Sequence, residues 1–438
     1  MSALFEKLFS IRARDSTVSK EVRSGIANFL AASYVLLLNS QLFSTKASVP
    51  SFEVAVATAI TGAVGSILLG LCTNLPLTLA PAAGLNAYLA NMIDQFPSEA
   101  LEGYRNTMTL TWLVGLALVL TAPCLSSSFI VNLVQQFPKS LRHGLVASIG
   151  FLLVFLSFRT FSFSFSDGKL YIFLFGLFIL QLLNVLRIPG GTLLSIVICA
   201  VLLFFYSKHP LPNTIFLLPK IGSISYSFNS QMFLKSWKEI VGGSIGIFWI
   251  ILLDLSVVPQ SILGTNDAFS PLLSTWPNNT QSIWTVLLTG LTTILGGLTG
   301  SGVCIPFAES SVGIREGGRT GFTAVVTGIC FLLSTIIMSL FQSIPLGATA
   351  PPLFVAGALM LKEVEHIEWR NERQVLPAIM TLCVVPFTNS LMSGFILGLA
   401  VLVIEFLLQL IECQQTFHNT VCEEATVTQE GQSEVCIS

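Results

Sequence analysis

Long apolar segments separated by short polar ones run through most of the chain. A transmembrane helix needs about 20 predominantly apolar residues to cross the hydrocarbon core of a bilayer. We therefore predict an all-α polytopic membrane protein with about fourteen transmembrane segments. They lie at 25–44, 54–73, 76–94, 108–128, 143–162, 169–187, 190–207, 240–263, 284–298, 300–314, 320–341, 347–361, 374–388 and 391–411.

Three of these segments, 76–94, 300–314 and 347–361, are short and rich in proline and glycine. The first two share a pattern in which a short apolar stretch reaches a proline and is followed by small residues and a polar side chain. Proline disfavours helix in the residue before it and suits the first turn of a helix. We therefore predict a short strand followed by a half-helix in each, which breaks the third and tenth transmembrane segments.

The polar stretch 208–239 divides the chain into two halves, 25–207 and 240–411, with seven predicted segments each. An odd number of segments gives the two halves opposite orientations in the membrane, which is the inverted-repeat arrangement of many transporters. The broken segment is the third one in each half. This correspondence predicts a seven-plus-seven inverted repeat.

The distribution of lysine and arginine predicts the orientation. The N-terminal tail, 1–24, carries five of these residues and is therefore assigned to the cytoplasm. An even number of segments returns the tail 412–438 to the same side and places 208–239 outside. Two features oppose this assignment: four lysines in 208–239, and a glycosylation sequon at Asn278 on the predicted cytoplasmic side.

Composition supports the membrane location and excludes other classes. Of 438 residues, 53% are hydrophobic and 10% are charged, whereas soluble domains carry about 25% charged residues. The mean hydropathy is +0.79. The net charge of −2 gives no sign of nucleic-acid binding.

Ionisable and amide side chains inside the predicted segments are the candidate functional residues. Asp254 lies within 240–263, Glu309 follows the predicted helix break in 300–314, and Asn86 occupies the corresponding position in 76–94. Carboxylates at membrane depth are costly and usually functional. A structural role, in which each side chain hydrogen-bonds a neighbouring helix or backbone group, remains an alternative. Glu405 lies near the end of its segment and is interpreted as interfacial.

Two buried carboxylates predict a class of solute. They can accept hydrogen bonds from the N–H groups of a planar heterocycle, and they can bind protons. The N-terminus of a half-helix would add N–H donors. No lysine or arginine lies near the middle of a predicted segment, so a neutral polar solute is favoured over a free anion. No metal or cofactor is expected.

At these residues the chain resembles the nucleobase–ascorbate transporter superfamily (nucleobase:cation symporter-2), and within it the AzgA-like hypoxanthine/guanine/adenine permeases. The resemblance extends from about residue 20 to 411. Its most specific part is a Glu-x-x-x-Gly-x-x-Glu-Gly-Gly-Arg-Thr-Gly run that begins at Glu309. The similar stretches are 25–34, 74–88, 138–142, 309–328 and 348–357.

The resemblance implies a core and a gate domain, proton-coupled uptake of purine bases across the plasma membrane, and often a homodimer. It implies that Asp254 and Glu309 bind the base and carry the coupled proton, and that Asn86 takes part in recognition. The neighbouring Gly84, Ala308 and Ser310 are predicted to contact substrate as well. The chain departs from the usual pattern at Val257, where a second Asp is common, and at 302–306, where a Ser/Thr-rich run is common.

Three alternatives remain at this point. An anion carrier of the same architecture, for sulfate or bicarbonate, is disfavoured by the two acids. An intramembrane hydrolase with Asp254 and Glu309 as an acid/base pair is disfavoured because neither acid lies in a Gly-x-Gly-Asp-like context. A non-transporting receptor or scaffold is the third.

Overall fold

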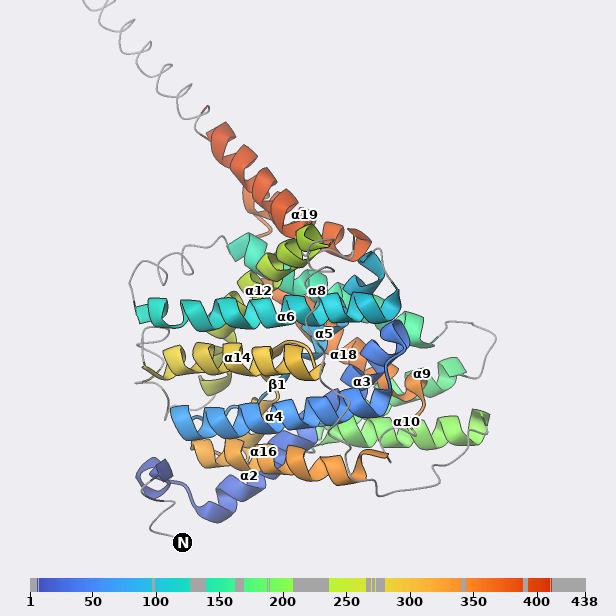
Figure 1. The fold of residues 1–438 in the computed structure, drawn as a ribbon, viewed down its shortest axis with the longest axis vertical. Coiled ribbons are helices and arrows are strands. Elements are labelled where there is room, and N and C mark those ends of the chain that lie inside the picture. Colours follow the sequence, from blue (N-terminus) through green and yellow to red (C-terminus); the bar gives the residue numbers. More distant parts are fainter. Residues whose placement is uncertain are drawn as a thin grey trace, which may run out of the picture.

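The fold is that of a helical membrane protein, shown by a computed structural model of the chain (Figure 1). The structure describes residues 8–96, 99–126, 139–161, 169–186, 190–207, 236–264, 280–339, 344–388 and 393–409, with the single residues 6, 188, 269, 272 and 411. The sequon at Asn278, most of the linker 208–239 and the tail 412–438 lie outside this part of the chain.

Within the described residues, α-helices alternate with short 3₁₀ turns (η) and with two three-residue strands. The first half contains η1 (Arg12–Arg14), α2 (Val18–Ala32), α3 (Tyr34–Ala47), α4 (Ser51–Thr73), β1 (Leu79–Pro81), α5 (Ala83–Met92), η2 (Ile93–Gln95), α6 (Ala100–Thr121), η3 (Pro123–Ser126), α8 (Lys139–Phe161), α9 (Lys169–Val185) and α10 (Gly191–Ser207). The second half contains α12 (Trp237–Leu263), α14 (Thr280–Thr299), β2 (Cys304–Pro306), α15 (Ser310–Arg315), α16 (Gly321–Ser334), η6 (Thr335–Ile337), η7 (Leu346–Thr349), α18 (Ala350–Leu361), η8 (Lys362–His366) and α19 (Glu372–Thr388), followed by a helix over Ser393–Gln409.

The two predicted strands form and pair with each other. Leu79 lies opposite Pro306, and Pro81 lies opposite Cys304, in an antiparallel register. Each strand ends at its proline, which has no N–H to donate to a ladder, and the chain enters a helix shortly afterwards. The prediction of two strands at the broken segments is therefore confirmed, and the pair joins the two halves of the chain.

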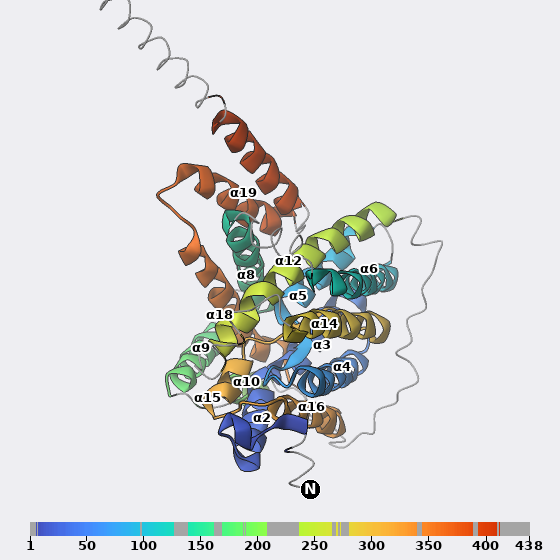
Figure 2. The same cartoon turned by 90° about the vertical axis from the view of Figure 1, so that its left-hand side faces the viewer.

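The helices are arranged in two groups around this pair. In Figure 1, α6, α14, α4 and α16 lie side by side, with α2 against α16. The second group contains α8, which packs against α18 and α19, and α9, which packs against α10. Figure 2 shows α12 between α6 and α8. The two strands contact α4 and α14, so they lie within the first group.

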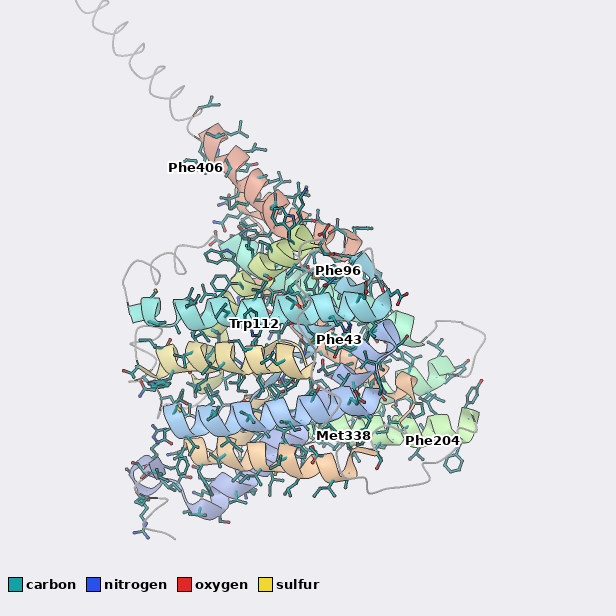
Figure 3. The ribbon with its side chains drawn as sticks, viewed as in Figure 1. Phe43, Phe96, Trp112, Phe204, Met338 and Phe406 are labelled. Carbon is teal, nitrogen blue, oxygen red and sulfur yellow. The ribbon has the colours of Figure 1, made fainter. Side chains whose placement is uncertain are left out.

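Polar and apolar side chains are distributed as expected for a protein surrounded by lipid. Thirty-eight residues of the buried set are polar or charged, among them Asn39, Thr58 and Asn86, all fully buried. Large apolar side chains are exposed instead: Phe205 is 82% and Phe387 is 86% accessible. In Figure 3, Phe43 lies inside the bundle, whereas Phe406 projects from the last helix, away from the body. Exposed large apolar side chains together with many buried polar ones are what lipid surroundings require, although most of the buried residues are apolar as well.

By length and composition, three helices of the described chain can each cross a membrane alone: Val18–Ala47, Ser51–Thr73 and Thr280–Thr299. The first combines α2 and α3, which are separated at Ser33. The all-helical architecture with two strands agrees with the sequence analysis, while the number of fourteen crossings stays a prediction.

Two predicted boundaries differ from the structure. Helix α2 begins at Val18, not at residue 25, because Thr17 caps it: its hydroxyl accepts a hydrogen bond from the Lys20 N–H at 3.3 Å. Part of the predicted tail 1–24 is therefore helical. In the predicted segment 300–314, the half-helix α15 begins only after Glu309 and extends to Arg315, one residue beyond the predicted end.

A glycine at the entrance to β2 should be indispensable for this arrangement. Gly302 has a φ of +86°, and a Cβ there would lie 2.4 Å from the Asn86 Oδ1 atom. We expect Gly302→Ala to lower the melting temperature of the purified protein clearly, because backbone strain alone costs about 1–3 kcal/mol. Gly62→Ala is the control, since its nearest neighbour is a methyl group at 3.3 Å. Equal melting temperatures for the two variants would contradict this interpretation.

Candidate functional site

A buried amide network fixes the point where the two strands meet. The Asn86 side chain accepts a hydrogen bond from the Val303 N–H at 2.8 Å and donates to the Ser301 carbonyl at 3.1 Å. It also donates to Asn39 Oδ1 at 3.0 Å, and Asn39 donates in turn to the Ser301 carbonyl. Backbone groups that the strand leaves unpaired are thereby satisfied by side chains, as buried N–H and C=O groups must be.

Helix α2 holds the half-helix α15 and the turn that follows it. Asn28 Oδ1 accepts a hydrogen bond from the Gly313 N–H at 2.7 Å. The buried Glu21 carboxylate accepts from the N–H groups of Arg319 and Thr320, at 3.0 and 3.3 Å, and also from the Thr323 hydroxyl. The position of Glu309 at the start of α15 therefore depends on residues about 290 positions earlier in the chain.

A cavity of about 310 Å³ lies between two walls. The first wall consists of Tyr34 of α3, residues 82–84 at the start of α5, Asp254 of α12, and residues 305–309 between β2 and α15. The second wall consists of His143, Val146 and Leu153 of α8, Ala356, Leu359 and Met360 of α18, and Glu363 of η8. The cavity is large enough for a small heterocyclic solute.

Glu309 is the carboxylate most firmly held in the first wall. Its Oε1 atom accepts a hydrogen bond from the Tyr34 hydroxyl at 2.8 Å. Tyr34 is itself 6% accessible, so the phenol is fixed by packing and in turn fixes the carboxylate. The first turn of α5, at Ala83 and Gly84, also lines the cavity. A helix N-terminus presents N–H donors, so a donor surface lies beside this acceptor.

The second wall contributes a hydrogen-bonded pair that our sequence interpretation missed. His143 Nδ1 and Glu363 Oε2 are 2.7 Å apart. His143 is 7% accessible, and Glu363 is half-buried. The Glu363 carboxylate lines the same cavity as Asp254, close enough for the two negative charges to repel each other when both groups are ionised. No sequence signal beyond position marks either residue. His143 is the first residue of the predicted segment 143–162, and Glu363 lies two residues after the segment 347–361, where polar side chains are ordinary.

The structure brings four of the six predicted site residues together and places two elsewhere. Asp254, Glu309, Gly84 and Ala308 line the cavity. Asn86 lies behind the strands in the amide network. Ser310 faces β1, where its hydroxyl accepts from the Thr78 N–H at 2.9 Å. Direct contact of Asn86 or Ser310 with a solute stays a prediction. Asn86 bonds the backbone around β2 and the Asn39 side chain, and Ser310 bonds the Thr78 backbone.

The polar side chains of the cavity define its chemistry. The described lining residues include three carboxylates (Asp254, Glu309 and Glu363), one imidazole and one phenol, but no lysine or arginine. Most of the remaining surface is aliphatic or aromatic. Such a lining favours a flat, partly apolar solute that donates hydrogen bonds, and it opposes the entry of an anion.

The fold is of the seven-plus-seven type found among solved membrane-protein structures. The transmembrane domain of a cyanobacterium bicarbonate transporter, BicA, has a similar fold, with a TM-score of 0.62 and 14% sequence identity over 86% of this chain and 97% of that chain. Residues 19–397 match the model of the Permease family, Xan_ur_permease. The chain therefore belongs to this family of nucleobase and ascorbate transporters, as its motifs indicated.

Several curated relatives in this family are similar over nearly the whole chain. The nucleobase transporter PlAzg2 of Paenibacillus larvae is 28% identical, with coverage of 86% of this chain and 76% of its own length. The adenine permease AdeP of Escherichia coli is 26% identical (90% and 88%). The guanine/hypoxanthine permease PbuG of Bacillus subtilis is also 26% identical (86% and 88%).

The hydrogen bonds that Glu21 accepts should be important for folding. We expect Glu21→Ala to lower the melting temperature of the protein in detergent, because each buried donor left unpaired costs about 1–3 kcal/mol. Lys20→Ala, at the exposed neighbouring position of α2, is the control and should melt like the wild type. A Glu21→Ala protein that also melts like the wild type would show that the carboxylate does not hold the turn at 315–321.

Proposed function

We propose that this protein is a secondary active transporter that takes up purine nucleobases together with protons across the plasma membrane. The observation that carries the proposal is the Glu309 carboxylate, held by Tyr34 in a cavity that has three carboxylates and neither lysine nor arginine among its described lining residues. The names of the relatives support the substrate class: they include permeases for adenine and for guanine and hypoxanthine.

The cavity fits a purine in shape and in hydrogen bonding. The two walls come together at Gly84, where a Cβ would lie 3.2 Å from Met360 Sδ and 3.3 Å from Ile149 Cγ2. The cavity is therefore narrow beside Gly84, and a narrow cavity suits a flat purine ring. The Glu309 carboxylate is an acceptor for a ring N–H, and the N–H groups of the first turn of α5 are donors for a ring nitrogen or carbonyl oxygen.

The same carboxylates supply the means to couple transport to protons. Asp254 and Glu363 repel each other when both are ionised, and the described lining offers no lysine or arginine to compensate. A proton bound to Asp254 or Glu309 reduces the negative charge that must be desolvated when the site closes around a neutral base. An inward proton gradient then drives uptake.

The charge of the cavity also argues against the anion-carrier alternative. The fold resembles that of BicA, but a fold shared at 14% identity says nothing about the solute. An anion would be placed beside three carboxylates without a lysine or arginine from the described lining, which is electrostatically unfavourable. A homodimer stays a prediction from the resemblance.

The first test is uptake of radiolabelled purines by cells that express the protein. We expect saturable uptake of adenine, guanine or hypoxanthine that is faster at acidic external pH. Glu309→Ala should abolish it, because the principal acceptor is removed. Tyr34→Phe should raise KM several-fold, since one hydrogen bond contributes about 0.5–1.5 kcal/mol.

Tyr171→Phe is the matched control, because Tyr171 is 74% exposed and lies outside the cavity. Surface expression of every variant is measured alongside uptake. Undiminished uptake by Glu309→Ala would overturn the site assignment. Uptake of sulfate or bicarbonate without uptake of any purine would overturn the proposed function.

Asp254 should govern the pH dependence. We expect Asp254→Asn to retain purine binding while uptake becomes much less dependent on external pH, because an amide cannot take up and release the coupled proton. The measurement is initial uptake rate between pH 5 and 8 at saturating purine. Asp15→Asn, with a side chain 92% exposed, should keep the wild-type profile. A wild-type profile for Asp254→Asn would assign Asp254 a structural role.

A further inference from the structure

We propose that Glu363, held by His143, is a specificity-determining residue that accepts a hydrogen bond from an exocyclic amino group of the solute, so that amino-bearing purines are preferred over hypoxanthine. This inference rests on the proposed function and assigns the second wall a part in it. The two carboxylates predicted from the sequence, Asp254 and Glu309, both belong to the first wall.

The pair is poorly explained as a link between helices. Helices α8 and α18 already meet backbone to backbone: a Cβ at Gly150 would lie 2.6 Å from the Gly357 carbonyl oxygen, and a Cβ at Gly357 would lie 2.6 Å from the Gly150 carbonyl oxygen. Contacts this close stabilise membrane helices without polar side chains. Burying the His143 imidazole beside the half-buried Glu363 carboxylate adds a desolvation cost to an interface that is already formed. Its position on the cavity lining suggests another purpose.

The position of Glu363 suits recognition. Glu363 lines the same cavity as Glu309 and Asp254 but belongs to the opposite wall. The hydrogen bond between its Oε2 atom and His143 Nδ1, at 2.7 Å, fixes the orientation of the carboxylate. The His366 ring lies against the imidazole, with ring centroids 5.3 Å apart, and limits its movement. A carboxylate held in this way is preorganised to accept a hydrogen bond from a solute.

The number and placement of the acceptors then indicate the solute. An ionised carboxylate only accepts hydrogen bonds. Carboxylates on both walls can therefore bind a molecule that has N–H groups on more than one edge. Hypoxanthine carries N–H groups only on its rings. Adenine and guanine carry an exocyclic amino group in addition, and this group can reach the second wall while a ring N–H is bound by Glu309. A site that hydrogen-bonds an amino group of its solute discriminates against an analogue that lacks this group.

The test compares KM values of adenine and hypoxanthine for the wild type and for Glu363→Ala, His143→Ala and Glu363→Gln, in cells that express each variant at a measured surface level. We expect Glu363→Ala to raise the KM for adenine about ten-fold, as expected for loss of a hydrogen bond to a charged group, and to change the KM for hypoxanthine much less. His143→Ala should also raise the ratio of the KM for adenine to the KM for hypoxanthine, because the Glu363 carboxylate loses its hydrogen bond to His143. Glu363→Gln, which keeps an acceptor oxygen, should restore part of the preference.

Glu365→Ala is the matched control, since Glu365 belongs to the same turn η8 but is exposed and outside the cavity. A purely structural role of Glu363 would lower transport of both bases equally and leave the ratio of KM values unchanged, and that result would overturn the inference. If a variant transports neither base, binding of each base to the purified variant replaces uptake, and an unchanged binding ratio overturns the inference as well. A wild type that takes up no purine would instead overturn the proposed function itself.

Discussion

The structure depends on satisfying the backbone of two broken helices in an apolar environment. A continuous helix pairs its own N–H and C=O groups, but β1 and β2 cannot, because each is an extended segment of three residues within the bundle. They pair with each other, and Asn86 and Asn39 satisfy the groups that remain around Ser301 and Val303. This solution requires both halves of the chain, so the cavity beside the strands cannot form from one half alone.

The same constraint explains why the N-terminal helix is important for a site far away in sequence. Half-helix α15 has only six residues, which is too few to be stable without support. Asn28 and Glu21 of α2 supply that support through hydrogen bonds to the backbone at Gly313 and at Arg319. Glu309 then stands at the start of a fixed element, and Tyr34 orients its carboxylate. The apparent tail of the protein is therefore part of the architecture of the site.

The fold of this protein does not by itself determine which solute it binds. Its backbone arrangement is close enough to that of the bicarbonate transporter BicA to give a TM-score of 0.62. Solute preference must come from the side chains that line the cavity, and here the described lining is acidic on both walls. Asp254 and Glu309 occupy one wall and Glu363 the other, so the proposed solute is bound between acceptors instead of against one surface.

The sequence alone determined the membrane class, the two strands, the family and the carboxylates of the first wall. These follow from local signals: apolar length, the effect of Pro81 and Pro306 on the residues around them, and the cost of Asp254 and Glu309 at membrane depth. Only the tertiary structure showed that Asn86 and Ser310 bond the backbone behind the cavity, that α2 supports α15, and that His143 meets Glu363. Those pairs join residues about 220 to 300 positions apart. Hydropathy does not show which helix packs against which. The contact between His143 and Glu363 is therefore visible only in the tertiary structure.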